Sequence, residues 1–394
     1  MHPFLMRLLR GQGSGDSPAP HDDATWSLIV TEAEEQDLTF ILYRRLRESG
    51  LASQLPPALL DDLKKTVLGL TAQNLLFTQE LASILSAFDS RRVDCVPLRG
   101  PALAELLYEE PSARPMEDLD LLVRREALSE VVDALGSLGY REIDRRPGFA
   151  REFSYTLVLV KDRHGCLAVE PHWTIAYPPF VEKTDMDRVW ERTIRASVAG
   201  VESRRLCPTD LLLHLCLHLL HGGEHAPLLW FYEIDQLIRR NAASLDWAQA
   251  LRDAHAWGQE LLLVHALRMV AHLFHSPLPG ELLSELRQPA PSRPAGPAPT
   301  VIERKMVGLL MNNPRHSGRE EFALFFTLRG MQAKFRYARS LLFPSQDFVR
   351  FRYRPAGGRG ALLFLYFARV LQLSWGGMTW LADLVVSTGR QRRC

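Results

Sequence analysis

Apolar residues recur with helical spacing on both sides of a central segment. Within residues 26–48 and 57–90, apolar side chains return every three or four positions, a spacing that places them on one side of a helix. Helical spacing resumes at Pro208 and dominates the chain to Val386. The pattern predicts helical regions before and after a segment of different periodicity.

The central segment, residues 91–205, carries short apolar runs typical of strands. We predict strands over residues 93–98, 118–123, 154–160 and 166–170, with a hairpin turn over 161–165. Helices are predicted over 101–108, which begins with a proline, and over 126–138, which ends at Gly139. The predicted fold class is α+β, with a small mixed β-sheet core flanked by N- and C-terminal helical regions.

Domain boundaries follow from these patterns and from local composition. We predict a flexible leader over residues 1–24, a helical region over 25–90, the core over 91–205 and a second helical region over 206–287. Residues 288–300 are rich in proline and predict a semi-rigid linker. Residues 301–394 form a basic, mostly helical C-terminal region.

Composition is that of a globular protein with reduced cysteines. The chain has 394 residues, of which 46% are hydrophobic and 24% charged, enough to bury a full core. Its five cysteines are odd in number and lack paired or zinc-like spacing. We therefore expect a cytoplasmic protein without disulfides.

Charge is distributed unevenly along the chain. Residues 301–394 contain sixteen Lys or Arg against five Asp or Glu, a net of +11, and the formal net charge of +1 then leaves −10 for the rest. Such a basic region could bind RNA or an anionic membrane surface. Its apolar stretch over 361–386 contains Arg369 and Asp383, which are costly in hydrocarbon, so we do not expect it to span a membrane. We favour helices packed on the rest of the protein over an element lying on an anionic lipid surface.

Two carboxylates on the second predicted strand are the main chemical signal. Asp118 and Asp120 are two residues apart, so both leave the same face of the strand. Close carboxylates repel each other unless a cation or a proton lies between them, and their hard oxygen atoms favour Mg²⁺ or Mn²⁺. Glu170 on a later strand offers a third carboxylate, and His172 follows two residues on. The pattern predicts a metal site for phosphoryl transfer.

The segments RGPALAELLYEEPSARPMEDLDLLV and VEPHWTI carry these residues. They resemble the uncharacterised nucleotidyltransferase family of the polymerase-beta-like superfamily, in which a Lys-Gly turn, an Arg-Pro pair, an Asp-x-Asp strand and an acid-x-His-Trp strand recur. The resemblance extends over most of the chain from about residue 25. It implies a Mg²⁺-dependent or Mn²⁺-dependent enzyme that moves a nucleoside monophosphate from an NTP to an unidentified acceptor bearing a hydroxyl or phosphate group.

The resemblance also implies roles for individual residues. Asp118, Asp120 and Glu170 would be the catalytic residues and metal ligands. The nucleotide-binding residues would be Arg99, Gly100, Arg114 and His172. For Arg114, which precedes Pro115, the sequence leaves a structural ion pair and a contact with triphosphate equally open.

The sequence departs from the family pattern at two positions. Arg99 stands where the family usually has lysine, which keeps the charge but replaces an ammonium group with a planar fork. Glu170 is followed by Pro171 rather than by an apolar strand residue, which predicts an edge strand or a bulge.

Histidines form a second candidate cluster. His214, His218 and His221 lie on one face of a predicted helix, but no glutamate follows His214 as in zinc metalloproteases. We prefer a polar seam that packs toward the sheet or the nucleotide cleft. Trp230 and Tyr232, on the next helix, are predicted to pack.

Two other functions remain open. In one, the fold persists as a weakly active or inactive binding partner in a biosynthetic or toxin-antitoxin system. In the other, the basic C-terminal region binds RNA through aromatic side chains at Phe335, Tyr337, Phe348, Phe351 and Tyr353.

Overall fold

The computed structural model describes most of the chain as far as residue 280 and short parts of the remainder. It describes residues 1–11, 20, 22–108, 114–143, 146, 148–162, 166–177, 180–222, 225–280, 282, 325, 328, 330–346, 365–367 and 370–371. The linker 288–300, the aromatic residues Phe348, Phe351 and Tyr353, and most of the apolar stretch 361–386 lie outside these residues.

Helices build the N-terminal part of the molecule. They are α1 (Pro3–Leu9), α2 (Asp23–Glu35), α3 (Thr39–Glu48), the short 3₁₀ helix η2 (Leu51–Gln54) and α4 (Pro57–Ser90). Asp22 caps α2 by accepting a hydrogen bond of 2.8 Å from the Thr25 backbone N–H. Helix α4 starts at a proline, whose missing N–H is not needed in the first turn.

Residues 3–9 differ from the expected flexible leader over residues 1–24. Residues Pro3–Leu9 form a helix whose Phe4, Leu5 and Leu9 side chains are buried, and the ring of Phe4 packs edge-on against Trp26 at 5.4 Å. Burial of each large apolar side chain contributes about 2 kcal/mol. This gain fixes α1 against the following helices.

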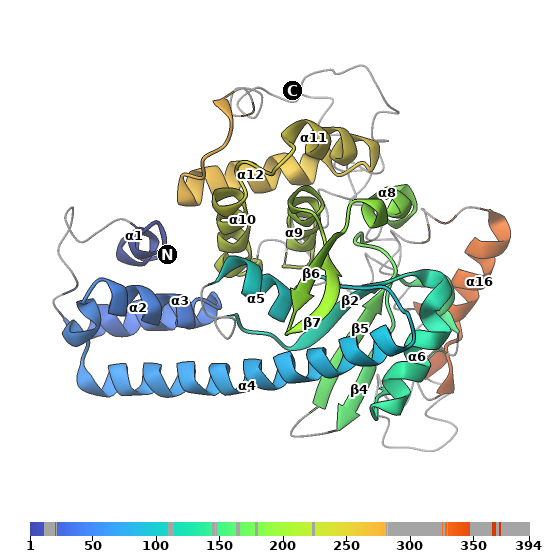
Figure 1. Cartoon of the computed structure of the whole chain (residues 1–394), viewed down its shortest axis with the longest axis horizontal. Helices are drawn as coiled ribbons and strands as arrows, with labels where there is room; N and C mark the ends of the chain where they lie inside the picture. Colours follow the sequence, from blue (N-terminus) through green and yellow to red (C-terminus); the bar gives the residue numbers. More distant parts are fainter. Residues whose placement is uncertain are drawn as a thin grey trace.

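A five-stranded mixed sheet forms the centre of the molecule (Figure 1). The strands are β1 (Cys95–Pro97), β2 (Asp118–Val123), β3 (Arg141–Glu142), β4 (Leu159–Asp162) and β5 (Cys166–His172), in the order β1-β2-β5-β4-β3. Strands β2 and β5 pair in parallel, and the other neighbours pair antiparallel. With the helices around it, this sheet confirms the predicted α+β class.

Strand β5 lies inside the sheet, so the edge position expected from Pro171 is wrong. Strand β4 begins at Leu159 opposite Val169, and an isolated antiparallel bridge between Thr156 and His172 continues the same register past the proline. Beyond that point the Pro171 carbonyl accepts hydrogen bonds of 3.0 Å from the Leu157 N–H and the Thr156 hydroxyl. The Thr156 hydroxyl also donates to the Leu157 carbonyl at 3.0 Å, an acceptor opposite Pro171 that the proline, which lacks an N–H, cannot satisfy.

Helices and a hairpin surround the sheet. They are α5 (Pro101–Leu107), η4 (Arg125–Ala127), α6 (Leu128–Ser137), α7 (Phe149–Phe153), η5 (Val181–Lys183), α8 (Met186–Glu191), the hairpin of β6 (Ile194–Val198) and β7 (Val201–Arg205), α9 (Pro208–Gly222), α10 (Leu228–Arg240), α11 (Trp247–Ala256), α12 (Glu260–Phe274) and α16 (Met331–Leu342). Figure 1 shows α4 along one side of the sheet and α9 to α12 on the other.

The two faces of β2 contribute to different parts of the structure. Leu119 and Leu121 belong to the core formed with α4 and α6, while Leu122 on the opposite face packs in the core that contains α9 and α10. Because side chains alternate along a strand, Asp118 and Asp120 share the face of Leu122. The fold therefore directs both carboxylates toward α9.

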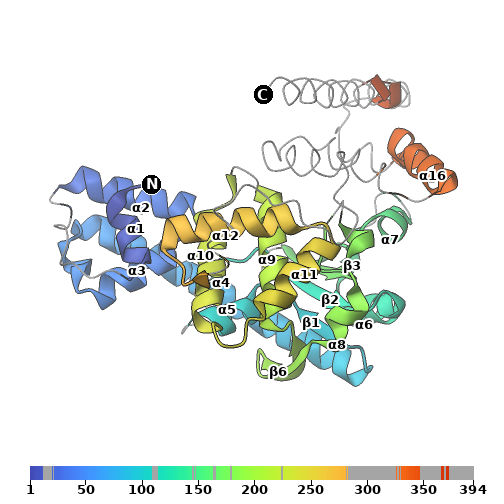
Figure 2. The same cartoon turned by 90° about the horizontal axis from the view of Figure 1, so that it is seen from above.

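The described part of the C-terminal region docks on α7. Tyr337 and Leu341 of α16 are buried against Phe149 and Phe153, and Figure 2 shows α16 at the opposite end of the molecule from α1 to α3. Tyr337 is therefore not available to stack a base, contrary to the RNA-binding hypothesis, whereas Phe335 is 71% exposed. Within the described residues, no helix is long and apolar enough to cross a membrane.

Candidate active site

The three predicted carboxylates meet on one face of the sheet. In the parallel pairing of β2 with β5, Asp120 lies opposite Glu170 and Asp118 lies opposite Ala168. Residues paired across parallel strands point to the same face. The structure therefore places Glu170 beside Asp120, while Asp118 lies two residues away along β2.

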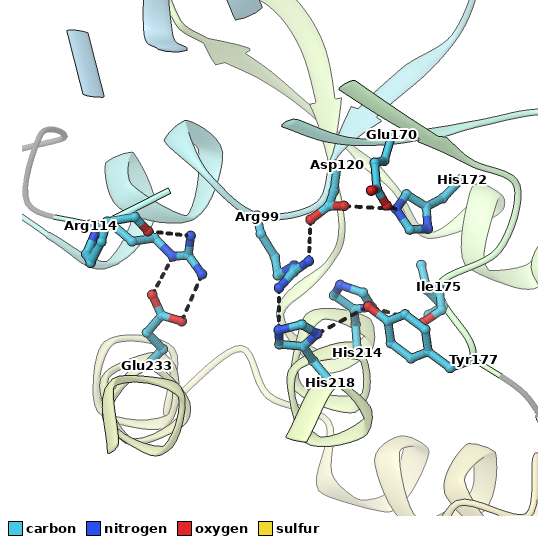
Figure 3. A network of polar contacts seen from close by, with 11 residues as sticks. Arg99, Arg114, Asp120, Glu170, His172, Ile175, Tyr177, His214, His218 and Glu233 are labelled. Atoms are coloured by element: carbon cyan, nitrogen blue, oxygen red, sulfur yellow. Dashed lines mark hydrogen bonds and ion pairs between the residues drawn. The ribbon is translucent and has the colours of Figure 1, made fainter. Parts of the chain in front are cut away.

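His172 completes a cluster with two of these carboxylates (Figure 3). Its Nε2 atom lies 2.9 Å from Asp120 Oδ1 and 3.7 Å from Glu170 Oε2. One ligand atom each from Asp120, Glu170 and His172 falls within 4.8 Å of the others, and in the described part of the chain only this group has three such ligands together. Asp118, predicted as a ligand, is not in the group, and His172, predicted to bind nucleotide, is.

Arg99 reaches the cluster because β1 pairs antiparallel with β2. The Leu98 N–H donates a 3.0 Å hydrogen bond to the Asp120 carbonyl oxygen, which extends the pairing and places the next residue beside Asp120. The Arg99 guanidinium donates to the Asp120 carboxylate and to His218 Nε2 (Figure 3). A cation of the protein itself thus neutralises Asp120.

Gly100 makes the turn after Arg99 possible. Its backbone has φ 59° and ψ −130°, a conformation that side chains with a Cβ rarely adopt. A Cβ built there would meet its nearest atoms, including the Asp118 carbonyl oxygen, only at 3.8 Å. The glycine is therefore required by its backbone angles rather than by crowding.

The carboxyl groups of β2 and β5 differ in their affinity for protons. Burial raises the pKa of Asp118, and repulsion from Asp120 raises it further. Burial acts on Asp120 as well, but Arg99 and the hydrogen bond from His172 outweigh it and hold the pKa of Asp120 well below its usual range. Burial also raises the pKa of Glu170 to about 7. Asp120 is thus ionised, whereas Asp118 and Glu170 hold their protons more readily than ordinary carboxyl groups do.

This difference predicts how pH affects the metal-free protein. Glu170 titrates near pH 4.3 in an unfolded chain and near 7 in the fold, so the folded state binds more protons in this window. Its stability should therefore fall as the pH rises from about 4.5 to about 7. Melting temperatures in a chelating buffer should show this fall in the parent and a flatter profile in Glu170→Gln. Equal profiles would contradict the burial of an ionisable Glu170.

Helix α9 contributes two histidines to this region. A guanidinium can only donate, so His218 Nε2 accepts from Arg99 and the ring proton is on Nδ1, which donates to the Tyr177 hydroxyl at 3.3 Å. His214 Nδ1 donates to the Ile175 carbonyl at 2.9 Å, and burial lowers its pKa to about 3. Neither belongs to the described ligand cluster, and the side chain of His221 lies outside the described residues. The polar seam toward the sheet remains our interpretation.

Arg114 forms a buried ion pair with a residue that the sequence did not single out. Its Nε atom lies 2.6 Å from Glu233 Oε1 of α10, and the Tyr108 hydroxyl donates to the same oxygen at 3.2 Å. On the other side, Asn74 Nδ2 donates to the Arg114 carbonyl at 2.6 Å. These contacts fix the segment that enters β2 just before Asp118.

A cavity of about 480 Å³ joins these residues. It is lined by Asp37, Arg99, Gly100, Arg114, Pro115, Met116, Glu117, Asp118, Asp120, Tyr155, Glu170, His172, Tyr177, His218 and Trp230. All seven predicted site residues are among them. Glu117 also lines the cavity; it lies just before β2, which begins at Asp118.

Three aromatic residues of the cavity wall were missed by sequence reasoning. The Tyr155 ring lies 5.7 Å from that of His172 and 5.2 Å from that of Tyr177, and Trp230 lies 4.1 Å from His218. Trp230 was expected to serve packing alone. Each comes from an element distant in sequence from β2, so no local pattern marks it as part of the site.

Comparison with known proteins places the chain among nucleotidyltransferases. The family described as "Uncharacterised nucleotidyltransferase" matches residues 22–275. The antibiotic-resistance factor ANT(2'')-Ia is 19% identical, with 51% of this chain and 97% of its own covered and a TM-score of 0.30. An antigenic nucleotidyltransferase-like protein from Paracoccidioides brasiliensis is 16% identical, with 53% and 92% covered and a TM-score of 0.34. No protein with a curated description matches.

Proposed function

The chain belongs to the uncharacterised nucleotidyltransferase family, and from this premise we propose that it transfers a nucleoside monophosphate from an NTP to a hydroxyl group of an acceptor, with a divalent metal ion. The family inferred from the sequence motifs is thereby confirmed. The metal, the nucleotide and the acceptor belong to the proposal.

The proposed reaction is an in-line displacement at the α-phosphorus. The acceptor oxygen forms a bond to this atom while the bond to the oxygen bridging the α- and β-phosphates breaks, and pyrophosphate leaves with the electron pair. The acceptor proton passes to Glu170. Glu170 suits this role because its side chain lines the cavity and is 27% exposed, so an acceptor hydroxyl can reach it.

The protein contributes positioning and charge. Asp120 and Glu170 would hold the metal, with His172 and Asp118 beside them, and a bound divalent ion would neutralise the phosphate oxygens and polarise the α-phosphorus. Arg99 would turn from Asp120 toward the departing phosphates while His218 keeps it in the cavity. Because Gly100 has no side chain, a phosphate could approach the backbone next to Arg99.

The observation that carries the proposal is the in-register pair Asp120 and Glu170 at the base of the cavity. The two carboxylates on adjacent parallel strands would bind a metal ion, and the arginine beside them would bind the triphosphate. The structure brings these opposite charges together in one cavity.

Labelled nucleotides test the proposed reaction. The full chain is incubated with Mg²⁺ or Mn²⁺, each of the four NTPs, and extracts separated into small molecules, RNA and protein. Label from the α-phosphate should appear in an acceptor, and label from the γ-phosphate should leave in pyrophosphate. Transfer of γ-label to an acceptor, or no metal-dependent transfer in any fraction, would contradict the proposal. Mass spectrometry of the labelled fraction identifies the acceptor.

Substitution of Arg99 tests separately its proposed contact with the nucleotide and its ion pair with Asp120. Arg99→Gln should weaken NTP binding at least tenfold, because a charge-assisted fork is lost, and should tighten Mn²⁺ binding without nucleotide, because a competing cation leaves Asp120. Arg99→Lys should be intermediate, since it keeps the charge but not the fork. Calorimetric titration measures both affinities. The surface variant Arg141→Gln, which removes the same charge from an exposed pair, serves as control. Weaker Mn²⁺ binding in Arg99→Gln would exclude competition at Asp120.

A further inference from the structure

The ligand cluster beside Arg99 contains a nitrogen atom where the sequence predicted only carboxylates. Strand β5 places Glu170 and His172 on one face, and the parallel register puts Leu122, rather than Asp118, opposite His172. His172 is 4% exposed, and its ring lies against that of Tyr155 at 5.7 Å. The imidazole is thus fixed among the acids rather than free to swing into solvent.

We infer that Asp120, Glu170 and His172 form a mixed oxygen and nitrogen metal site, with His172 Nε2 as a ligand, which favours a first-row transition ion such as Mn²⁺ over Mg²⁺. The inference rests on the proposed function and specifies its metal. It assigns His172 to the ion rather than to the nucleotide.

The distances suit octahedral coordination of a small divalent ion. With bonds of about 2.1 Å, neighbouring ligand atoms of an octahedron lie about 3.0 Å apart and opposite ones about 4.2 Å apart. His172 Nε2 lies 2.9 Å from Asp120 Oδ1 and 3.7 Å from Glu170 Oε2, and the whole group fits within 4.8 Å. Small shifts of the Glu170 side chain would place the three atoms on one side of an ion.

The chemistry of the donors decides which ion fits. Mg²⁺ prefers carboxylate, carbonyl and water oxygens, whereas an imidazole nitrogen suits transition ions. A neutral imidazole carries its proton on either nitrogen, so the ring can offer the Nε2 lone pair by moving this proton to Nδ1. An imidazole that serves a Mg²⁺ site would more often remain outside the ligand set.

The open side of the cluster faces the cavity. The Glu170 side chain is 27% exposed, whereas those of Asp120 and His172 are 4% and 5% exposed. Three protein ligands on one side of an octahedron leave the remaining positions for water or for phosphate oxygens. The site is therefore suited to hold an ion that also contacts substrate.

Pulsed EPR of Mn²⁺ bound to the full chain, without nucleotide, tests this assignment. The spectrum should show coupling to a directly bound ¹⁴N, and labelling of histidine with ¹⁵N should replace it by ¹⁵N coupling. In His172→Gln, whose side chain offers an amide oxygen, the coupling should disappear, and the ratio of Mn²⁺ to Mg²⁺ affinity should fall about ten- to a hundredfold. His218→Gln, which changes another histidine of the cavity wall, should keep the coupling.

The outcomes separate this inference from the proposed function. Absence of histidine coupling in the parent overturns it, and so does coupling that survives His172→Gln and disappears in His218→Gln. Failure of the parent to bind Mn²⁺ overturns both the inference and the metal site of the proposed function. Coupling from His172 without any nucleotidyl transfer supports the inference and contradicts the function. Because ¹⁵N labelling uses the parent protein, the test does not depend on the folding of a variant.

Discussion

Asp120→Asn should reduce nucleotidyl transfer at least a thousandfold and also destabilise the fold, whereas Asp118→Asn should reduce transfer and leave the metal-free fold as stable or more stable. The two residues share one strand face, but their surroundings differ. Arg99 and His172 favour the ionised form of Asp120, while burial and repulsion disfavour that of Asp118.

The two variants should differ in stability because only Asp120→Asn leaves a buried charge unpaired. The Arg99 and Asp120 side chains are 14% and 4% exposed, so neutralising Asp120 leaves a buried guanidinium without its counter-charge, at a cost of about 3 kcal/mol. Neutralising Asp118 removes repulsion and leaves no charge unpaired. The stabilisation due to ionised Asp120 is present above pH 4 and is lost as the pH falls through its lowered pKa.

Thermal melts of both variants, with and without metal and NTP, measure this prediction. Only the parent should gain a large increase in melting temperature from metal plus nucleotide. Two equally stable metal-free variants would contradict the assignment of Arg99 to Asp120. Ligand-induced increases of the same size in the parent and in both variants would contradict the metal site itself.

The sequence was sufficient to predict that the two aspartates of β2 lie on one face of the sheet. The strand period of two puts Asp118 and Asp120 on one side and Leu119 on the other, whatever the strand pairs with. The turn at Arg99 and Gly100 was also predictable, because the apolar run before it ends at a charged residue and a glycine. Such features depend on neighbours in sequence.

The composition of the ligand cluster depends on strand register and was not predictable. A register shifted by two residues would have placed Asp118 opposite Glu170 and Asp120 opposite His172, with the same alternation. The observed pairing of Asp120 with Glu170 brings His172 into the cluster and leaves Asp118 outside. Nothing in the residues 118–123 or 166–172 alone selects one register over the other.

Contacts between distant elements were equally inaccessible. Glu233 lies in a helix that reads as ordinary amphipathic packing, and only the docking of α10 beside α5 shows that it meets Arg114. The helix at residues 3–9 has only seven residues, too few to show a helical period, so it cannot be distinguished from a leader until its burial against α2 is known.

The pair of Arg114 and Glu233 gives the second large effect. Glu233→Leu should destabilise the protein by about 3 to 5 kcal/mol, because it leaves the Arg114 guanidinium buried and unpaired. The two side chains are 7% and 2% exposed, so water cannot replace the lost carboxylate. The double variant Arg114→Met, Glu233→Leu should recover most of this loss, since replacing a whole buried ion pair by apolar side chains is often neutral or stabilising.

The same double variant decides between the two roles that the sequence left open for Arg114. Arg114 lines the cavity and also holds the segment before Asp118, so we expect it to contact triphosphate as well as Glu233. Chemical denaturation should then show recovered stability in the double variant, while the KM for NTP remains raised at least tenfold. Recovery of both stability and KM would show that Arg114 serves only as the partner of Glu233. Failure to recover stability would show that the pair is coupled to other buried groups, of which Tyr108, hydrogen-bonded to Glu233, is the first to test with Tyr108→Phe.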